Sequence, residues 1–180
     1  MYELFVLGEL SDGPMHGYLL HEVLVKVLGP TRGVSWGTLY PVLKHLDEQS
    51  YIHQVDGGSL YHGRARKVYE ITAIGRGHFF ELMAKPLAHN ADADDIFRIK
   101  LSKFHLIDVS LRREILHQYK MFLDFVLNGL VLNQERVTRE SAISEAERPD
   151  IVQAIDYQIH SYTARLVWVT QKLECLGGTE

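Results

Sequence analysis

The sequence predicts a mainly α-helical protein with one small β-hairpin, composed of an N-terminal winged helix-turn-helix and a C-terminal all-α half. Three observations support this fold class. The expected elements of the first half run helix, helix, helix, strand, strand, helix. Most glycines and prolines fall within residues 1–86, whereas residues 110–176 form long periodic helical patterns. Because no alternating strand and helix units occur, this order excludes a parallel-sheet enzyme and fits helices with an appended wing.

The first half begins with three short helices. Apolar residues recur at helical spacing over residues 4–10 and stop at the turn formed by residues 11–14. A second helix is expected from about Met15 to Leu28, where a Gly-Pro pair ends it. Ser35 is placed to cap a third helix, because its hydroxyl can accept a hydrogen bond from a free backbone amide two or three residues later.

A hairpin and a fourth helix complete the first half. Two alternating segments, residues 52–55 and 67–71, predict strands around a long glycine-containing loop that begins at residues 56–59. Thr72 can then cap the fourth helix. A polar, alanine-rich segment at residues 86–95 is expected to join the two halves, so we place the domain boundary after residue 86.

The second half is expected to contain two long helices, one over residues 110–139 and one that starts at Pro149, a residue well suited to a first helical turn. The later helix repeats apolar residues at alternating spacings of four and three, the heptad pattern of a helix that packs against another helix. We interpret this seam as a dimer contact in preference to burial within the same subunit. Its positions are Ile155, Ile159, Tyr162, Leu166, Val169, Leu173 and Leu176.

Composition limits the functional classes. The chain has 180 residues, a net charge of −4 and one cysteine, Cys175, so it has no internal disulfide framework and fits a reducing compartment such as the cytoplasm. The first ten residues do not have the pattern of a secretory signal, and no apolar stretch is long enough to span a membrane. Because the net charge is negative, nucleic-acid binding has to depend on a local basic patch.

Several motifs match catalytic or ligand-binding patterns only in their letters. Residues 33–37 read Gly-Val-Ser-Trp-Gly, as in a hydrolase nucleophile elbow centred on Ser35, but no strand precedes the serine and no parallel sheet is expected. A dinucleotide fingerprint at residues 75–80 lacks its third glycine, and a calcium loop at residues 92–103 lacks its glycine and its glutamate. The histidines show no metal-ligand spacing. We therefore expect no enzyme activity, no cofactor and no metal.

The basic signal is local and coincides with the predicted hairpin and third helix. Arg64, Arg66 and Lys67 lie on the hairpin with no carboxylate between Gly57 and Lys67. The third helix begins with hydroxyl side chains and a positive dipole end, a combination that binds phosphate while the helix enters the major groove. A hairpin and a helix on one face would form a DNA footprint, whereas three charges in a loop are otherwise only a solvated surface.

Spaced motifs over about residues 4–80 closely resemble the PadR family of bacterial transcriptional regulators. They are residues 7–10 (Leu-Gly-Glu-Leu), 13–18 (Gly-Pro-Met-His-Gly-Tyr), 37–43 (Gly-Thr-Leu-Tyr-Pro-Val-Leu) and 63–69 (Gly-Arg-Ala-Arg-Lys-Val-Tyr). Ala65 replaces a proline that is usual in the family. The resemblance implies a homodimeric winged-helix repressor that binds a palindromic operator in double-stranded DNA and releases it on a small-molecule or stress signal. It places eight residues at the DNA: Tyr18, Ser35, Thr38, Tyr40, Lys44, Arg64, Arg66 and Lys67.

The second half resembles, in length and pattern, the longer phenolic-acid-responsive subgroup of that family. Residues 1–86 would then be the DNA-binding domain and residues 87–180 a dimerisation and effector domain. Arg98, His160 and Trp168 would suit a small aromatic acid, because they offer a base, a hydrogen-bonding ring and a flat apolar surface. In the plainer alternative these three side chains are only solvated or peripheral. A further alternative is a regulator that binds a ligand or a protein and for which DNA binding is secondary.

Overall fold

The computed structural model describes residues 1–29, 33–61 and 64–177, while the side chains of residues 56–66 lie outside the described part. It confirms the predicted mainly α-helical fold with a small antiparallel sheet. The chain forms two compact units. The first unit comprises residues 1–86 and 90–108, and the second comprises residues 87–89 and the chain from Val109 onward. Residues 90–108, which the sequence-based boundary assigns to the second half, thus pack with the first unit.

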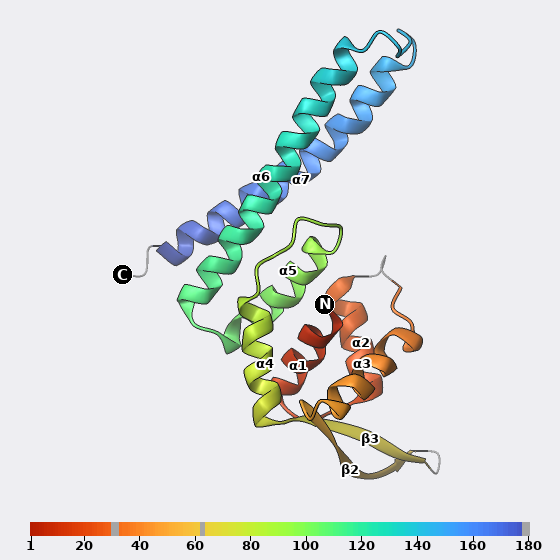
Figure 1. The fold of residues 1–180 in the computed structure, drawn as a ribbon, viewed down its shortest axis with the longest axis vertical. Helices are drawn as coiled ribbons and strands as arrows, with labels where there is room; N and C mark the ends of the chain where they lie inside the picture. Colours follow the sequence, from red (N-terminus) through yellow and green to blue (C-terminus); the bar gives the residue numbers. More distant parts are fainter. Residues whose placement is uncertain (30–32, 62–63, 178–180) are drawn as a thin grey trace. The chain divides into compact units, whose positions relative to one another are not determined.

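The first unit is built around helix α1 (Tyr2–Asp12), whose residues 4–10 are all buried. A helix that is apolar on every side has to be covered on every side. Accordingly, α1 contacts α2 (Gly17–Leu28), α3 (Trp36–Glu48) and α4 (Ala73–Ala84), and the four helices surround one core (Figure 1). The predicted helices of the first half are therefore confirmed.

The sheet has three strands rather than the predicted two. Strand β1 (Met15–His16) pairs with β3 (Arg64–Ile71), which also pairs with β2 (Ile52–Tyr61), and all pairings are antiparallel. The second helix starts at Gly17 and not at Met15, because the backbone of Met15 and His16 is extended beside β3. The expected loop at residues 56–59 was also wrong, since β2 continues through it with a register irregularity between Asp56 and Leu60.

The start of α4 is set by one hydroxyl and one glycine. Thr72 Oγ1 accepts a hydrogen bond from the Gly75 amide at 3.0 Å, as predicted, and donates to the Ser50 carbonyl at 2.7 Å. A Cβ on Gly75 would lie 1.9 Å from the carbonyl oxygen of Tyr51, so no side chain fits at this position. These contacts hold α4 against the segment between α3 and the hairpin.

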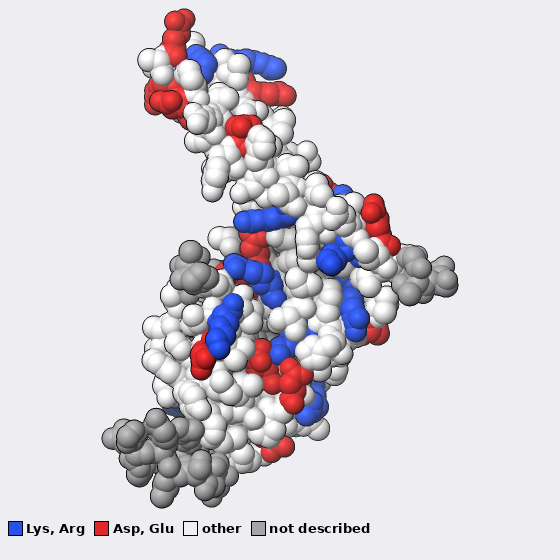
Figure 2. All heavy atoms as spheres, turned by 180° about the vertical axis from the view of Figure 1, so that it is seen from behind, with Lys and Arg blue, Asp and Glu red and all other residues white. Residues whose placement is uncertain are grey.

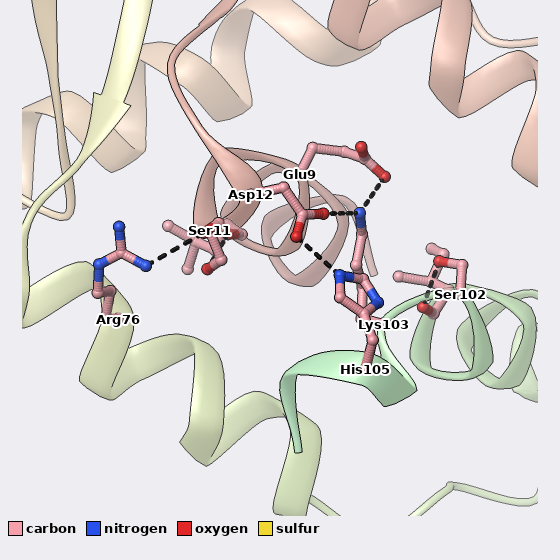
Figure 3. Close-up of polar contacts among 9 residues, drawn as sticks. Glu9, Ser11, Asp12, Arg76, Ser102, Lys103 and His105 are labelled. Carbon is pink, nitrogen blue, oxygen red and sulfur yellow. Dashed lines mark hydrogen bonds and ion pairs between the residues drawn. The ribbon is translucent and has the colours of Figure 1, made fainter.

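Part of the predicted linker folds into helix α5 (Ala93–Ser102), which is followed by the short helix η1 (Phe104–Leu106). Figure 3 shows how side chains from this segment reach the end of α1. Lys103 Nζ lies 2.9 Å from Glu9 and 2.8 Å from Asp12, and His105 lies 2.7 Å from the other oxygen of Asp12. Burial opposes ionisation of Asp12, but the hydrogen bonds from Lys103 and His105 outweigh it and lower the pKa of Asp12.

Lys100 of α5 is buried as well, and among the described residues no carboxylate pairs with it. Lys100 is 1% exposed, and its ammonium donates to the carbonyls of Met83 at 2.9 Å and Lys85 at 2.5 Å. These carbonyls lie at the C-terminal end of α4, where a carbonyl accepts no hydrogen bond from an amide of the same helix. The helix dipole also favours a cation at this end. Burial nevertheless lowers the pKa of Lys100 to about 8.

The second unit is a pair of long helices, α6 (Val109–Arg139) and α7 (Arg148–Gly177), which lie side by side (Figure 1). Both were predicted with nearly these bounds. The Arg148 guanidinium closes the connection by donating to the carbonyls of Val137, Thr138, Glu140 and Ile143. At the other end, Arg113 donates to the carbonyl of Leu176 at 2.7 Å.

The heptad seam of α7 faces a partner within the same chain. Ile155 and Val169 are buried and the other five seam positions are half-buried, because α7 packs along α6. The intrachain alternative therefore accounts for this seam, and a dimer contact has to use other side chains as well. Among the described residues, no helix is both long enough and apolar enough to cross a lipid bilayer.

Candidate nucleic-acid interface

The N-terminal end of α3 is open to solvent. Ser35, Trp36 and Gly37 are exposed, and the first amides of a helix have no acceptor within it. Ser35 occupies the N-cap position as predicted, but its hydroxyl accepts no backbone amide. It lies 3.2 Å from the hydroxyl of Thr38, whose amide donates to the Ser35 carbonyl at 3.0 Å. The hydroxyl-to-amide cap was thus predicted wrongly, and both hydroxyls stand beside the positive end of the α3 dipole.

The outer face of α3 carries the two other predicted DNA contacts of this helix. Tyr40 is 52% exposed, and Lys44 extends into solvent with its Nζ 3.5 Å from Glu48. An exposed ion pair between residues four apart on a helix stabilises the fold by roughly 0.5 kcal/mol or less. A phosphate could therefore replace Glu48 as the partner of Lys44 at little cost.

Tyrosines connect α2, α3 and the base of the hairpin. Tyr18 is 45% exposed and stacks on His16 with a centroid distance of 5.6 Å. Tyr69 of β3 is buried, and burial raises the pKa of its phenol, with further contributions from the nearby Tyr40 and Asp47. Tyr18 and Tyr40 are therefore at the surface and not buried between helices.

The hairpin presents a basic residue on β3. Lys67 is exposed and lies opposite Asp56 in the sheet register. Arg64 and Arg66 also belong to β3, but their side chains fall outside the described residues. Strand β1 pairs Met15 with Tyr69 immediately before α2 begins, so the hairpin and α2 are joined at their bases.

Sequence reasoning missed an aromatic stack at the start of α3. The His21 and Trp36 rings lie 4.2 Å apart at 15°, and the Trp36 and Tyr40 rings lie 5.4 Å apart at 30°. The spacing of four residues between Trp36 and Tyr40 was a visible signal, since such residues share one helix face. The contribution of His21 was not visible, because it comes from another helix.

The three residues expected at an effector belong to different units. Arg98 lies in α5 of the first unit, where it donates to the Leu28 carbonyl at 2.7 Å and pairs with Asp95. His160 and Trp168 lie in α7 of the second unit. His160 is largely exposed with Asp156 at 3.3 Å, and the ammonium of Lys172 lies 5.6 Å from the centre of the Trp168 ring.

Charges of both signs lie close together on one face of the protein. Figure 2 shows basic and acidic side chains interspersed on the face that it presents, not a continuous basic field. Among the described residues, no group of three or more His, Cys, Asp or Glu side chains could hold a metal ion. The surface at the start of α3 and the hairpin offers hydroxyls, helix amides, aromatic rings and the lysines Lys44 and Lys67, groups that can contact a phosphate-bearing polymer.

Comparison with known proteins locates a family signature in the same part of the chain. Residues 6–81 match the model of the transcriptional regulator PadR-like family. Similar solved structures include Bacillus subtilis PadR in complex with operator DNA, which is 16% identical over 96% of both chains with a TM-score of 0.45. A PadR-like transcriptional regulator from Bacillus cereus is 23% identical over both full chains, with a TM-score of 0.40. Bacillus subtilis PadR in complex with p-coumaric acid is 16% identical over 97% of this chain and 94% of that chain, with a TM-score of 0.41. Comparison with curated protein sequences gives no match.

Proposed function

Residues 6–81 match the PadR-like family of transcriptional regulators, whose members are not enzymes, and from that premise we propose that this chain is a homodimeric repressor released from its operator by a small molecule. The observation that carries the proposal is the solvent-exposed start of α3 beside the hairpin, with Tyr40 and Lys44 on its outer face. Because such a regulator acts on chromosomal DNA, we place it in the cytoplasm.

We propose that α3 enters the major groove and the hairpin follows the adjacent phosphates. In this mode Ser35, Thr38 and the first amides of α3 bind phosphate, while Tyr40 and Lys44 approach base edges. Lys67, together with Arg64 and Arg66, would supply sequence-independent phosphate contacts. Tyr18, at the start of α2, would contact the backbone next to α3.

A gel-shift titration of the full chain with the DNA upstream of its own gene tests this proposal. If Arg64, Arg66 and Lys67 of both subunits neutralise phosphates, affinity should fall roughly a thousandfold between about 50 and 200 mM salt. Lys67→Gln should weaken binding to every duplex and flatten the salt dependence. Lys120→Gln, which removes a half-buried lysine of α6 paired with Asp124, is the control. Salt-independent binding, or unchanged binding by Lys67→Gln and by Arg64→Ala with Arg66→Ala, would favour a regulator in which DNA is secondary.

A dimer is supported by solvent-exposed apolar side chains in the second unit. Met121, Phe125 and Leu132 of α6 are 64%, 59% and 66% exposed, and their spacings of four and eleven residues place them on one helix face. Tyr157 and Trp168 of α7 are also eleven residues apart and exposed. In a dimer that binds successive major grooves, a second copy would cover these faces, and the two α3 helices would have to lie about 34 Å apart.

Sedimentation analysis of the full chain tests the dimer. Phe125→Asp should yield monomers that keep their helical content but bind operator DNA weakly, because a carboxylate would be buried against apolar partners. Leu166→Glu, in the seam between α6 and α7, should instead unfold the second unit, since Leu166 is half-buried within the chain. A Phe125→Asp dimer with wild-type operator affinity would exclude the α6 face.

We propose a small aromatic acid as the effector, on the basis of Trp168 and His160 in α7. An indole with a lysine ammonium over its ring offers both a flat apolar surface and a positive charge. Arg98 would have to give up Asp95 and the Leu28 carbonyl in order to bind a carboxylate. Calorimetry with hydroxycinnamic-type acids on the wild type and on His160→Ala tests this class. Binding that leaves operator affinity unchanged would refute it, because release requires a differential affinity for the two states.

A further inference from the structure

The aromatic stack of His21, Trp36 and Tyr40 is exposed at the surface assigned to DNA. Trp36 is 40% exposed and Tyr40 is 52% exposed, and both rings lie on the outer face of α3. A tryptophan that serves only to pack two helices together is normally buried more deeply than Trp36. Trp36 leaves a large apolar area open instead.

The orientation of the indole is fixed by a residue of another helix. His21 of α2 covers one face of the Trp36 ring at a centroid distance of 4.2 Å. Its Nε2 lies 2.7 Å from the carbonyl oxygen of Val34, and since a carbonyl only accepts, the histidine donates this bond. Val34 is itself buried, so the His21 ring has a firm support. A ring held in this way loses little side-chain entropy on binding.

The chemistry of the exposed ring selects its partner. An indole carries no charge to bind phosphate strongly, and its open surface is apolar. In the major groove, the apolar group that a base pair presents is the C5-methyl group of thymine. Trp36 is the first residue of α3, where a helix that enters the groove comes closest to base edges.

We propose that Trp36 is a specificity-determining residue that contacts the C5-methyl group of a thymine in the operator, and that His21 is a positioning residue for it. This inference rests on the proposed function, since it assumes that α3 enters the major groove. It adds a sequence-reading contact that the basic residues of the hairpin do not provide.

A thymine-to-deoxyuridine scan of the bound duplex tests the proposal, because deoxyuridine lacks only the methyl group. At the contacted position, the affinity of the wild type should fall about fourfold, because this is the contribution to binding expected from the burial of one methyl group. Trp36→Ala should bind the thymine and deoxyuridine duplexes equally. Phe80→Ala, which removes a 48% exposed aromatic ring from α4, should retain the wild-type discrimination as a matched control.

Variants of His21 separate positioning from general stability. His21→Ala removes the stacking ring and should reduce the methyl discrimination, whereas His21→Phe restores a ring and should recover it. The salt dependence of binding should not change in either variant, because neither alters a phosphate contact. Circular dichroism monitors the fold. If Trp36→Ala does not fold, Trp36→His keeps a stacking ring with a polar edge and should lose the discrimination.

The outcomes separate this inference from the function on which it depends. A wild-type chain that does not retard its upstream DNA overturns the proposed function. A wild-type chain that binds this DNA but tolerates deoxyuridine at every position overturns the role of Trp36 alone. Equal discrimination by the wild type and a folded Trp36 variant overturns it as well.

Discussion

The buried ammonium of Lys100 should make the stability of the first unit rise with pH above neutrality. Burial lowers the pKa of Lys100 from 10.5 to about 8. This shift corresponds to a change of about 3 kcal/mol in the free energy of unfolding between low and high pH. Between these two pKa values the folded chain holds Lys100 neutral while the unfolded chain still binds the proton. Unfolding then takes up a proton, so the free energy of unfolding increases with pH through this window and levels off above about 10.5.

Urea denaturation of the wild type and of Lys100→Met from pH 7 to 10.5 measures the effect. The stability difference, wild type minus variant, should grow by about 3 kcal/mol over this range, because methionine carries no proton. Subtraction removes the opposing contribution of Tyr69, whose pKa is raised. A Trp168→Phe background makes fluorescence report on Trp36, which lies in the first unit. Lys26→Met, a change at a largely exposed lysine, is the control. A pH-independent difference for Lys100→Met would refute the reasoning.

Three further substitutions test other contacts. Lys103→Met leaves the buried carboxylate of Glu9 without its cation and should cost about 3–5 kcal/mol in urea denaturation, and adding Glu9→Gln should recover part of this loss. Gly75→Ala forces a Cβ to within 1.9 Å of the Tyr51 carbonyl oxygen and should lower the Tm sharply or prevent folding, whereas Gly77→Ala, with no atom nearby, should be neutral or mildly stabilising. Arg148→Gln removes donors from the α6–α7 connection and should cost about 2 kcal/mol, with faster amide exchange over residues 137–148 as the readout. Unchanged exchange there would contradict the role of Arg148.

The elements that were predicted correctly are those encoded by local pattern. Apolar spacing identified the helices, and the heptad repeat identified α7 together with its need for a helical partner. Thr72 was recognised as a cap because its acceptor and the Gly75 amide are three residues apart. The spaced motifs between residues 4 and 80 indicated a resemblance to the PadR family, and the match of residues 6–81 to the PadR-like family model confirms this resemblance.

Contacts between distant segments decided the rest. Strand β1 exists because Met15 and His16 meet Tyr69 and Val68, more than fifty residues later. Similarly, Lys100 of α5 and Lys103, which follows this helix, look like surface residues in the sequence but are buried, since their carbonyl and carboxylate partners lie in α4 and α1.

By itself the sequence determined the helix order, the hairpin and the residues that could form a DNA footprint, because periodicity and short-range hydrogen bonding act within a few positions. Only the tertiary structure decided that the α7 seam packs on α6 within the chain. It also decided that His21 supports Trp36. The physical reason is that each of these outcomes is a contact between residues of different helices. Such a contact depends on how the helices pack in space, which the local sequence pattern does not specify.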